Sequence, residues 1–147
     1  TAHYFLPEVE ARVLIPIINM IEETAIEVEQ AGISKIGILA TDGTIKTGLY
    51  QTALKRHGIE SEIPDEKCQL AVMEAIYAVK AGCDLKDAAR ILEPALIYMS
   101  ERVDAVIAGC TELPILLRGP THGLVVIDTL RVLARRIVAC ALIPEYA

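Results

Sequence analysis

Apolar positions follow two spacings along this chain. Short, nearly continuous apolar runs predict buried strands, whereas longer segments with apolar residues three and four positions apart predict amphipathic helices. Some helical segments are followed by glycine, which readily adopts the left-handed conformation just past a helix end. The spacing predicts strands over 13–17, 35–41, 59–63, 104–108 and 124–127, and helices over 5–11, 21–31, 44–57, 65–81, 84–101, 111–117 and 129–142.

The alternation of strands and helices indicates an α/β fold built on a mainly parallel sheet. The segment 59–63 stops at Pro64 and is predicted as an edge strand. In open parallel sheets, ligands bind beyond the carboxyl ends of the strands. Thr41, Cys110 and Asp128 each follow an apolar strand at that end. We therefore expect one site that lies near all three residues.

Composition and charge exclude several classes of protein. The chain has 147 residues, which suits one domain, and no apolar run approaches the roughly 20 residues that a membrane helix needs. A net charge of −6 with scattered Lys and Arg predicts no nucleic-acid partner. The four cysteines form no CxxC pair and no zinc-type cluster, so we expect no metal site and a reducing, cytoplasmic location. A mean hydropathy of +0.42 indicates a large core, a subunit interface or a face that another segment covers.

Cys110 is the strongest candidate for chemistry. It lies between the apolar run 106–109, predicted as a strand, and the run 115–117, predicted as a short helix. Backbone N–H groups and the helix dipole at such a point favour thiolate over thiol, and a thiolate can act as a base or a nucleophile. The alternative is a structural cysteine, since cysteines are commonly buried as small apolar residues.

Thr41, Gly43 and Thr44 form a second candidate group, between a predicted strand and a predicted helix. One interpretation is a helix N-cap with a tight Asp-Gly turn. The other is a loop whose hydroxyl and N–H groups hold a substrate carboxylate. The two interpretations are compatible.

Three motifs carry a resemblance to a known family. Ala-Gly-Cys-Thr-Glu-Leu at 108–113 closely resembles the second catalytic-cysteine motif of the aspartate/glutamate racemase superfamily. Ala-Thr-Asp-Gly-Thr at 40–44, followed by Tyr50, resembles that family's Ala-Thr-x-Gly-Thr substrate loop. Thr1-Ala2-His3 resembles the tail of its Cys-Asn-Thr-Ala-His motif. The order and spacing of the motifs extend the resemblance over nearly the whole chain.

The resemblance implies a three-layer α/β/α lobe, one of two pseudo-equivalent lobes. Residues 1–20 would lead out of the first lobe, about 21–128 would form the second lobe, and 129–147 would form a C-terminal helix. The family's first catalytic cysteine would lie two residues before Thr1. The chain therefore resembles the C-terminal two-thirds of a racemase, without the first catalytic cysteine.

The implied activity is cofactor-independent interconversion of L- and D-aspartate, or of glutamate, without pyridoxal phosphate. Cys110 would be one of two opposed acid/base thiols, so this chain alone is expected to be inactive. Glu112 favours the aspartate branch, because glutamate racemases carry histidine there. The implied partner is a small acidic amino acid, with no membrane contact and a homodimer in the intact protein. The implied substrate-binding residues are Thr1, Thr41, Gly43, Thr44, Lys80 and Thr111, although Lys80 is also consistent with an ordinary surface lysine.

Two alternatives remain open at the level of sequence. The chain is also consistent with a one-cysteine relative, an arylmalonate-type decarboxylase or a maleate-type isomerase, in which Cys110 alone delivers the proton. It is also consistent with a non-catalytic lobe that binds a dicarboxylate. Outside the candidate site, we expect Asp128 to orient site loops or cap the last helix, and His57 and His122 to face solvent. We expect no role for Cys68, Cys83 and Cys140.

Overall fold

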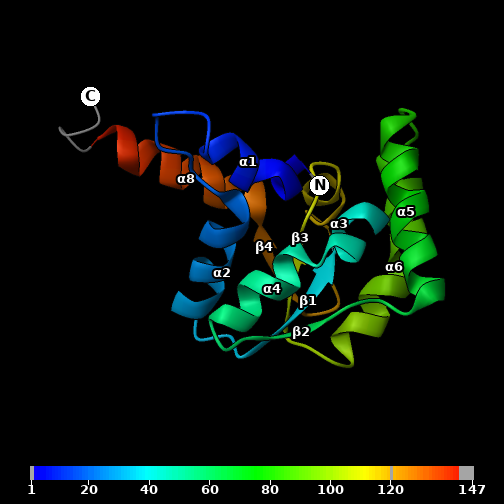
Figure 1. Ribbon diagram of the computed structural model, residues 1–147. Coiled ribbons are helices and arrows are strands. Elements are labelled where there is room, and N and C mark those ends of the chain that lie inside the picture. Colours follow the sequence, from blue (N-terminus) through cyan, green and yellow to red (C-terminus); the bar gives the residue numbers. More distant parts are fainter. Residues whose placement is uncertain (1, 120, 143–147) are drawn as a thin grey trace.

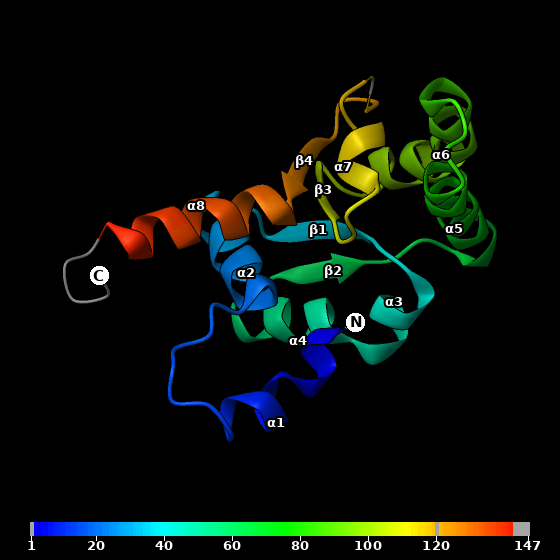
Figure 2. The same cartoon turned by 90° about the horizontal axis from the view of Figure 1, so that it is seen from above.

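The computed structural model describes residues 2–119 and 121–142. Within them, one parallel sheet has the strand order β2-β1-β3-β4, in which β2 and β4 lie outermost (Figure 2). The strands are β1 (Lys35–Leu39), β2 (Glu60–Glu62), β3 (Ala105–Ala108) and β4 (Val125–Asp128). All three pairings are parallel. The predicted α/β fold is confirmed, and 59–63 does contain an edge strand.

Helices connect the strands and cover the sheet (Figure 1). Aspartates at 65, 84 and 128 and an asparagine at 19 cap four of the helices by accepting hydrogen bonds from first-turn N–H groups, which local sequence favours. The helices are η1 (Ala2–Phe5), α1 (Leu6–Glu10), α2 (Met20–Gln30), α3 (Asp42–Thr47), α4 (Leu49–Arg56), α5 (Glu66–Lys80), α6 (Leu85–Ser100), α7 (Leu113–Leu116) and α8 (Thr129–Ala141).

Side chains of the two central strands alternate between two apolar cores. Ile36 and Ile38 of β1 pack with α2 and α4, whereas Val106 and Ala108 of β3 pack with α5, α6 and α7. Successive residues of a strand point to opposite faces, so each strand is apolar on both sides. Figure 1 shows α2 and α8 to the left of the sheet and α5 and α6 to its right. This is the expected three-layer α/β/α arrangement.

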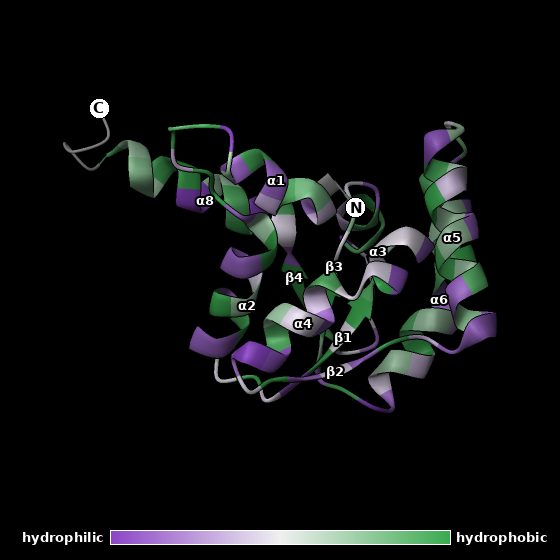
Figure 3. Cartoon of the chain, viewed as in Figure 1, coloured by the Kyte–Doolittle hydropathy of each residue, from purple (hydrophilic) through white to green (hydrophobic). Residues whose placement is uncertain are grey.

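The prediction of a strand at 13–17 is wrong. This segment is an irregular connection between α1 and α2, with Leu14 fully exposed and Ile15 73% exposed. Figure 3 shows its apolar colouring on the outside of the molecule. An apolar run becomes a strand only when a neighbouring strand supplies hydrogen bonds, and none of the described strands lies beside it.

The predicted helix 44–57 is two helices instead of one. α3 ends and α4 begins at Gly48, whose φ of 65° is the left-handed conformation that stops an α-helix. The break turns α4 back across the sheet, so that Tyr50 and Leu54 enter the core beside β1. Among the described residues, none of the helices has the length and apolar content that a bilayer crossing requires.

Candidate active site

The carboxyl ends of β1 and β3 bring two loops into direct contact. Leu39 lies beside Ala108 in the sheet, and the Gly109 N–H donates a hydrogen bond to the Leu39 carbonyl (2.8 Å). A Cβ atom on Gly109 would lie 3.0 Å from the Ala40 Cβ and 3.2 Å from the Tyr50 Cε2. Glycine at this position therefore lets the Thr41 loop and the Cys110 loop approach each other. The sequence predicted that Thr41 and Cys110 share this edge of the sheet, but not the role of Gly109.

Asp128 lies at the same edge of the sheet but has a structural role. It is paired with Ala108 across β3 and β4. Its carboxylate accepts hydrogen bonds from the Leu130 and Arg131 N–H groups (3.0 and 3.2 Å) and so caps α8. The expectation that Asp128 caps the last helix is confirmed.

Thr41 and Thr44 hold the first loop in a fixed shape. Thr41 is the N-cap of α3, and its hydroxyl oxygen accepts from the Thr44 N–H (3.4 Å) and lies 3.1 Å from the Thr44 hydroxyl. The N-cap interpretation is confirmed. The tight Asp-Gly turn is not present, because α3 begins at Asp42 and includes Gly43. The two hydroxyls lie together at the sheet edge that carries Cys110.

Gln69 of α5 fastens this loop from the side. Its amide nitrogen donates to the Ala40 carbonyl (3.0 Å) and to the Asp42 carboxylate (2.8 Å). The Asp42 N–H points to the Met73 sulfur on the next turn of α5, at 3.4 Å. Sequence reasoning missed both α5 residues, because nothing in the local pattern shows which side of α5 faces the loop.

Cys110 is half-buried, and its surroundings favour the neutral thiol. Burial is the main cause that raises the pKa of the Cys110 thiol. Hydrogen bonds from the Leu113 and Glu112 N–H groups offset part of the rise in pKa, whereas the Glu112 carboxylate adds to it. The sequence-based expectation of a favoured thiolate is therefore wrong for the free protein. α7 is a single turn that begins only at Leu113, and its N–H groups do not outweigh burial.

Lys80 reaches the neighbourhood of Cys110 from the end of α5. Its ammonium lies 3.9 Å from the Glu112 carboxylate; the Lys80 side chain is 53% exposed and that of Glu112 17%. Thr111 is exposed beside Cys110. The structure thus places Thr41, Gly43 and Thr44 at the sheet edge that carries the Cys110 loop, because Gly109 lies against Ala40, and Lys80 reaches that loop through Glu112. Thr1 lies outside the described residues.

Tyr50 lies against Gly109, the residue before Cys110, and is 1% exposed. Burial raises the pKa of the Tyr50 phenol to about 12; a hydrogen bond with the Thr129 side chain lowers that pKa, and charge on Cys110 raises it. The Thr129 hydroxyl itself donates to the Ala108 carbonyl (3.1 Å). The sequence motif at 40–44 includes a following Tyr50, but the sequence predicts no role for this residue.

The other cysteines lie on helices or at a helix end. Cys68 is buried in α5 with its sulfur 3.8 Å from the Pro94 carbonyl, Cys83 is exposed, and Cys140 is half-buried near the end of α8. Among the described residues, no group of His, Cys, Asp or Glu is arranged to hold a metal ion.

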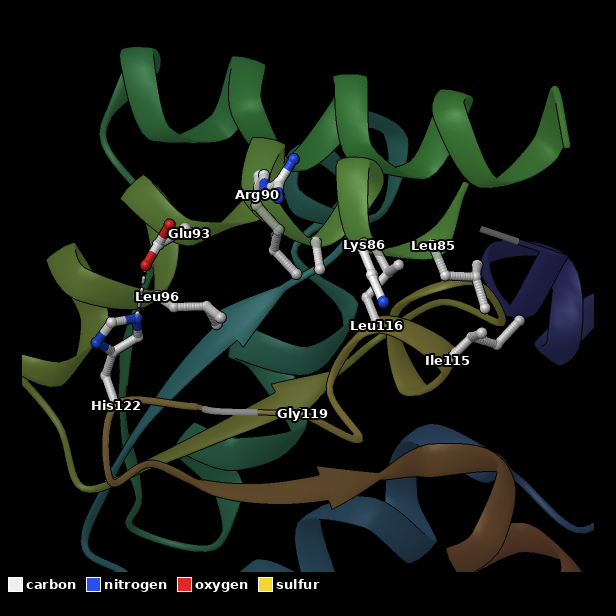
Figure 4. Close-up of a pocket in the computed structure, with 11 residues that line it drawn as sticks. Leu85, Lys86, Arg90, Glu93, Leu96, Ile115, Leu116, Gly119 and His122 are labelled. Atoms are coloured by element: carbon white, nitrogen blue, oxygen red, sulfur yellow. Dashed lines mark ion pairs between the residues drawn. The ribbon is translucent and has the colours of Figure 1, made fainter. Parts of the chain in front are cut away.

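A pocket of about 380 Å³ between α6 and α7 is separate from this site (Figure 4). Leu92, Leu96 and Leu116 contribute apolar side chains to it, and an ion pair between His122 and Glu93 (3.6 Å) closes one end. None of the candidate site residues lines this pocket.

Comparison with known proteins places the chain in a family. Residues 1–137 match the family model of the Asp/Glu/Hydantoin racemases. The chain belongs to this family. The resemblance drawn from the motifs around Cys110 and Thr41 is confirmed, and the Asp/Glu racemase fold with it.

Individual Asp/Glu racemases agree with this assignment. The structure of the Picrophilus torridus aspartate racemase superposes with a TM-score of 0.81 at 31% identity, over 99% of this chain and 62% of that one. The broad specificity amino-acid racemase RacX of Bacillus subtilis is 28% identical over 95% of this chain and 60% of its own length. A glutamate racemase of Aquifex aeolicus is 32% identical over 90% of this chain and 52% of its own. The chain thus spans between about half and two-thirds of these relatives.

Proposed function

We propose that this chain carries the Cys110 half of a racemase that interconverts L- and D-aspartate, with glutamate as the second acidic substrate to test. The observation that carries the proposal is the contact of Gly109 with Leu39 and Ala40, which places the Cys110 loop and the loop that begins at Thr41 at one edge of the sheet, in a chain of the Asp/Glu/Hydantoin racemase family. The reaction needs no pyridoxal phosphate and no metal. The intact protein acts in the cytoplasm as a homodimer.

The chemistry requires two acid/base groups on opposite faces of the α-carbon, because inversion returns the proton to the other face. One thiolate takes the α-proton, and the electron pair of the broken C–H bond passes into the carboxylate as an enediolate. The opposite thiol then donates its proton to the carbon. Because the pKa of Cys110 is raised, Cys110 enters this cycle as the thiol that donates, and it acts as the base in the reverse direction.

The loop residues bind the two ends of the substrate. The hydroxyls of Thr41 and Thr44, with the backbone N–H at Gly43, donate hydrogen bonds to the α-carboxylate on the Cys110 side of the sheet edge. Thr111 and Thr1 add hydroxyls beside the two thiols. In the free chain the Lys80 ammonium lies 3.9 Å from the Glu112 carboxylate. When aspartate binds, Lys80 exchanges this partner for the side-chain carboxylate of the substrate.

The opposing thiol comes from the part of the family's fold that these 147 residues do not span. None of the other three cysteines lies on β3 or on the two loops that form the site. The 147-residue chain by itself therefore gives little or no racemisation, whereas a chain extended to the length of its relatives is active.

The test is exchange of the α-proton of L-aspartate in D₂O, followed by NMR, with circular dichroism to follow the enantiomer. We compare the 147-residue chain and the extended chain, each with and without Cys110→Ala, and use Cys140→Ala as the matched control because Cys140 lies on α8, outside the two loops and the α5 residues that form the candidate site. Racemisation confined to the extended chain and abolished by Cys110→Ala supports the two-thiol mechanism. Equal activity in Cys110→Ala contradicts it.

Decarboxylation of an arylmalonate or isomerisation of maleate by the extended chain, without racemisation, would favour a one-cysteine enzyme. Aspartate binding without any exchange would favour a binding lobe.

A further inference from the structure

Side chains of α5 contact the chain on both sides of Thr41. The Gln69 amide nitrogen donates to the Ala40 carbonyl (3.0 Å) and to the Asp42 carboxylate (2.8 Å), which belong to the residues directly before and after Thr41. One turn further along α5, the Met73 sulfur accepts from the Asp42 N–H (3.4 Å). The position of Thr41 is therefore set by a helix that lies outside its own loop.

The two acceptors determine which end of the Gln69 amide faces the loop. A carbonyl oxygen and an ionised carboxylate can only accept hydrogen bonds, and the two N–H hydrogens of one amide group match them. The Gln69 Oε1 atom is left buried, with no hydrogen-bond partner among the described residues. Buried polar atoms are normally paired, so this orientation leaves one acceptor unsatisfied and is maintained by the two bonds that the nitrogen donates.

The Asp42 carboxylate is a negative charge in the loop that we propose binds the α-carboxylate of the substrate. Asp42 begins α3 directly after Thr41, and the hydroxyls of Thr41 and Thr44 lie 3.1 Å apart. Like charges brought together weaken binding, so an Asp42 carboxylate that moved freely would oppose an anionic substrate. Its hydrogen bond to Gln69 instead keeps this carboxylate on α5.

We propose that Gln69 is a positioning residue for substrate binding, which holds the loop 40–44 in the shape that binds the α-carboxylate and keeps the Asp42 carboxylate on α5. The inference rests on the role proposed above for this loop. Gln69 acts through the Ala40 carbonyl and the Asp42 side chain, without contact with the substrate. Its loss is therefore expected to weaken the binding of aspartate while the fold is retained.

The first test measures the loop in the 147-residue chain and needs no racemase activity. Gln69→Leu keeps the approximate size of the side chain but can donate nothing to the loop. The Ile45 N–H, which donates to the Thr41 carbonyl (3.0 Å), is expected to exchange its hydrogen about tenfold faster by NMR, while the amides of β1 and β3 are unchanged. Gln30→Leu is the matched control, because Gln30 is exposed at the end of α2.

The second test measures the binding of L-aspartate to the chain extended to the length of its relatives. Gln69→Leu is expected to raise the Kd and the KM for aspartate about tenfold and to leave kcat nearly unchanged, because contacts that serve the substrate and the transition state alike affect binding alone. Gln69→Glu places a carboxylate against that of Asp42 and is expected to weaken binding further. Gln30→Glu adds the same charge at an exposed position and is the control for charge.

A double variant tests the contact between the two side chains directly. Combining Gln69→Glu with Asp42→Asn restores one donor and one acceptor with their roles exchanged, and we expect it to recover part of the affinity that Gln69→Glu loses. Because each of these variants keeps the size of its side chain, the comparison remains informative if Gln69→Leu does not fold.

An unchanged exchange rate at Ile45 in folded Gln69→Leu would overturn the proposal, as would faster exchange with an unchanged Kd for aspartate. A double variant that binds aspartate no better than Gln69→Glu would also contradict it. Racemisation enters neither the exchange rate nor the Kd. An extended chain that binds aspartate without racemising it would therefore contradict the proposed function alone, whereas a parent chain that binds no aspartate would remove both proposals.

Discussion

Glu112 is the charged residue closest to the chemistry of Cys110. Its carboxylate raises the pKa of the thiol by charge and by accepting a hydrogen bond from it, and at the same time it pairs with Lys80 at 3.9 Å. A substrate that draws Lys80 away would leave Glu112 facing Cys110 alone. The residue after the Cys-Thr pair thus acts on the pKa of Cys110.

Replacing Glu112 by Gln is expected to lower the pKa of Cys110. The substitution keeps the size of the side chain but removes the negative charge that disfavours the thiolate. The pH at the midpoint of Cys110 alkylation therefore falls by roughly half a unit to one unit. Alkylation of the Cys110 peptide by iodoacetamide becomes faster at neutral pH. The pH profile of alkylation, measured on the 147-residue chain, gives both quantities.

Glu74→Gln is the control, because Glu74 is an exposed acid on α5 with no contact to the thiol. A Cys110 midpoint in Glu112→Gln that equals that of Glu74→Gln would show that the Glu112 carboxylate does not act on the sulfur.

At the scale of elements, His57 joins α2 to α4. Its Nε2 lies 2.9 Å from the Glu22 carboxylate and its Nδ1 2.9 Å from that of Glu29, and Arg56 also pairs with Glu22 at 2.7 Å. The expectation that His57 faces solvent is wrong, since its side chain is only 18% exposed. The pattern of α4 places His57 at a helix end but does not reveal that α2 presents two acids there.

The His57 bridge predicts that stability falls as pH rises. Hydrogen bonds to Glu22 and Glu29 raise the pKa of His57 in the folded chain above that of the unfolded chain. The folded state therefore holds the proton more tightly, and the bridge is fully formed below about pH 6.5, the ordinary histidine value. Its contribution is lost as pH rises through the folded-state pKa. Urea unfolding at pH values on either side of that transition measures the loss.

His57→Gln removes the titration while retaining a polar side chain of similar reach. We expect its urea midpoint to vary less than that of the parent chain between mildly acidic and mildly alkaline pH, where the glutamates stay ionised. His122→Gln is the comparison, because His122 makes a longer ion pair at a loop (3.6 Å). If the urea midpoint of His57→Gln depended on pH as strongly as that of the parent chain, His57 would not be the source of the pH dependence.

At the scale of the whole molecule, the N-terminal segment leaves apolar side chains in water. Tyr4, Phe5, Leu14 and Ile15 are all more than half exposed, and none belongs to either of the two cores. The apolar cores on the two faces of the sheet are packed without any side chain from these four residues. Exposed apolar surface of this kind promotes association.

Leu14→Ser is expected to reduce self-association of the 147-residue chain and to leave its stability within about 0.5 kcal/mol, because Leu14 contacts no core. Leu92→Ala, in contrast, creates a cavity beneath α6 at a residue that is 1% exposed and is expected to cost about 2–5 kcal/mol. Urea unfolding and sedimentation velocity measure the two effects. A loss of stability in Leu14→Ser comparable to that in Leu92→Ala would mean that Leu14 is buried in solution.

The sequence by itself determined the parts of this protein that depend on local spacing. The apolar runs at 35–39 and 105–108 form adjacent parallel strands, and this predicted that Thr41 and Cys110 would share one edge of the sheet. The predicted helices 65–81 and 84–101 also start within one residue of α5 and α6, because a helix start depends on local groups: the caps Asp65 and Asp84 accept from N–H groups two or three positions away.

Tertiary structure alone decided what depends on neighbours that are distant in the chain. The apolar run 13–17 has the spacing of a strand, but its state depends on whether another strand lies beside it. Gln69 holds the Thr41 loop, and Tyr50 lies against Gly109, through contacts that no local pattern encodes. The protonation of Cys110 follows the same logic. Its position after β3 is local, but burial and the carboxylate beside it set its pKa, and both arise only when the chain is folded.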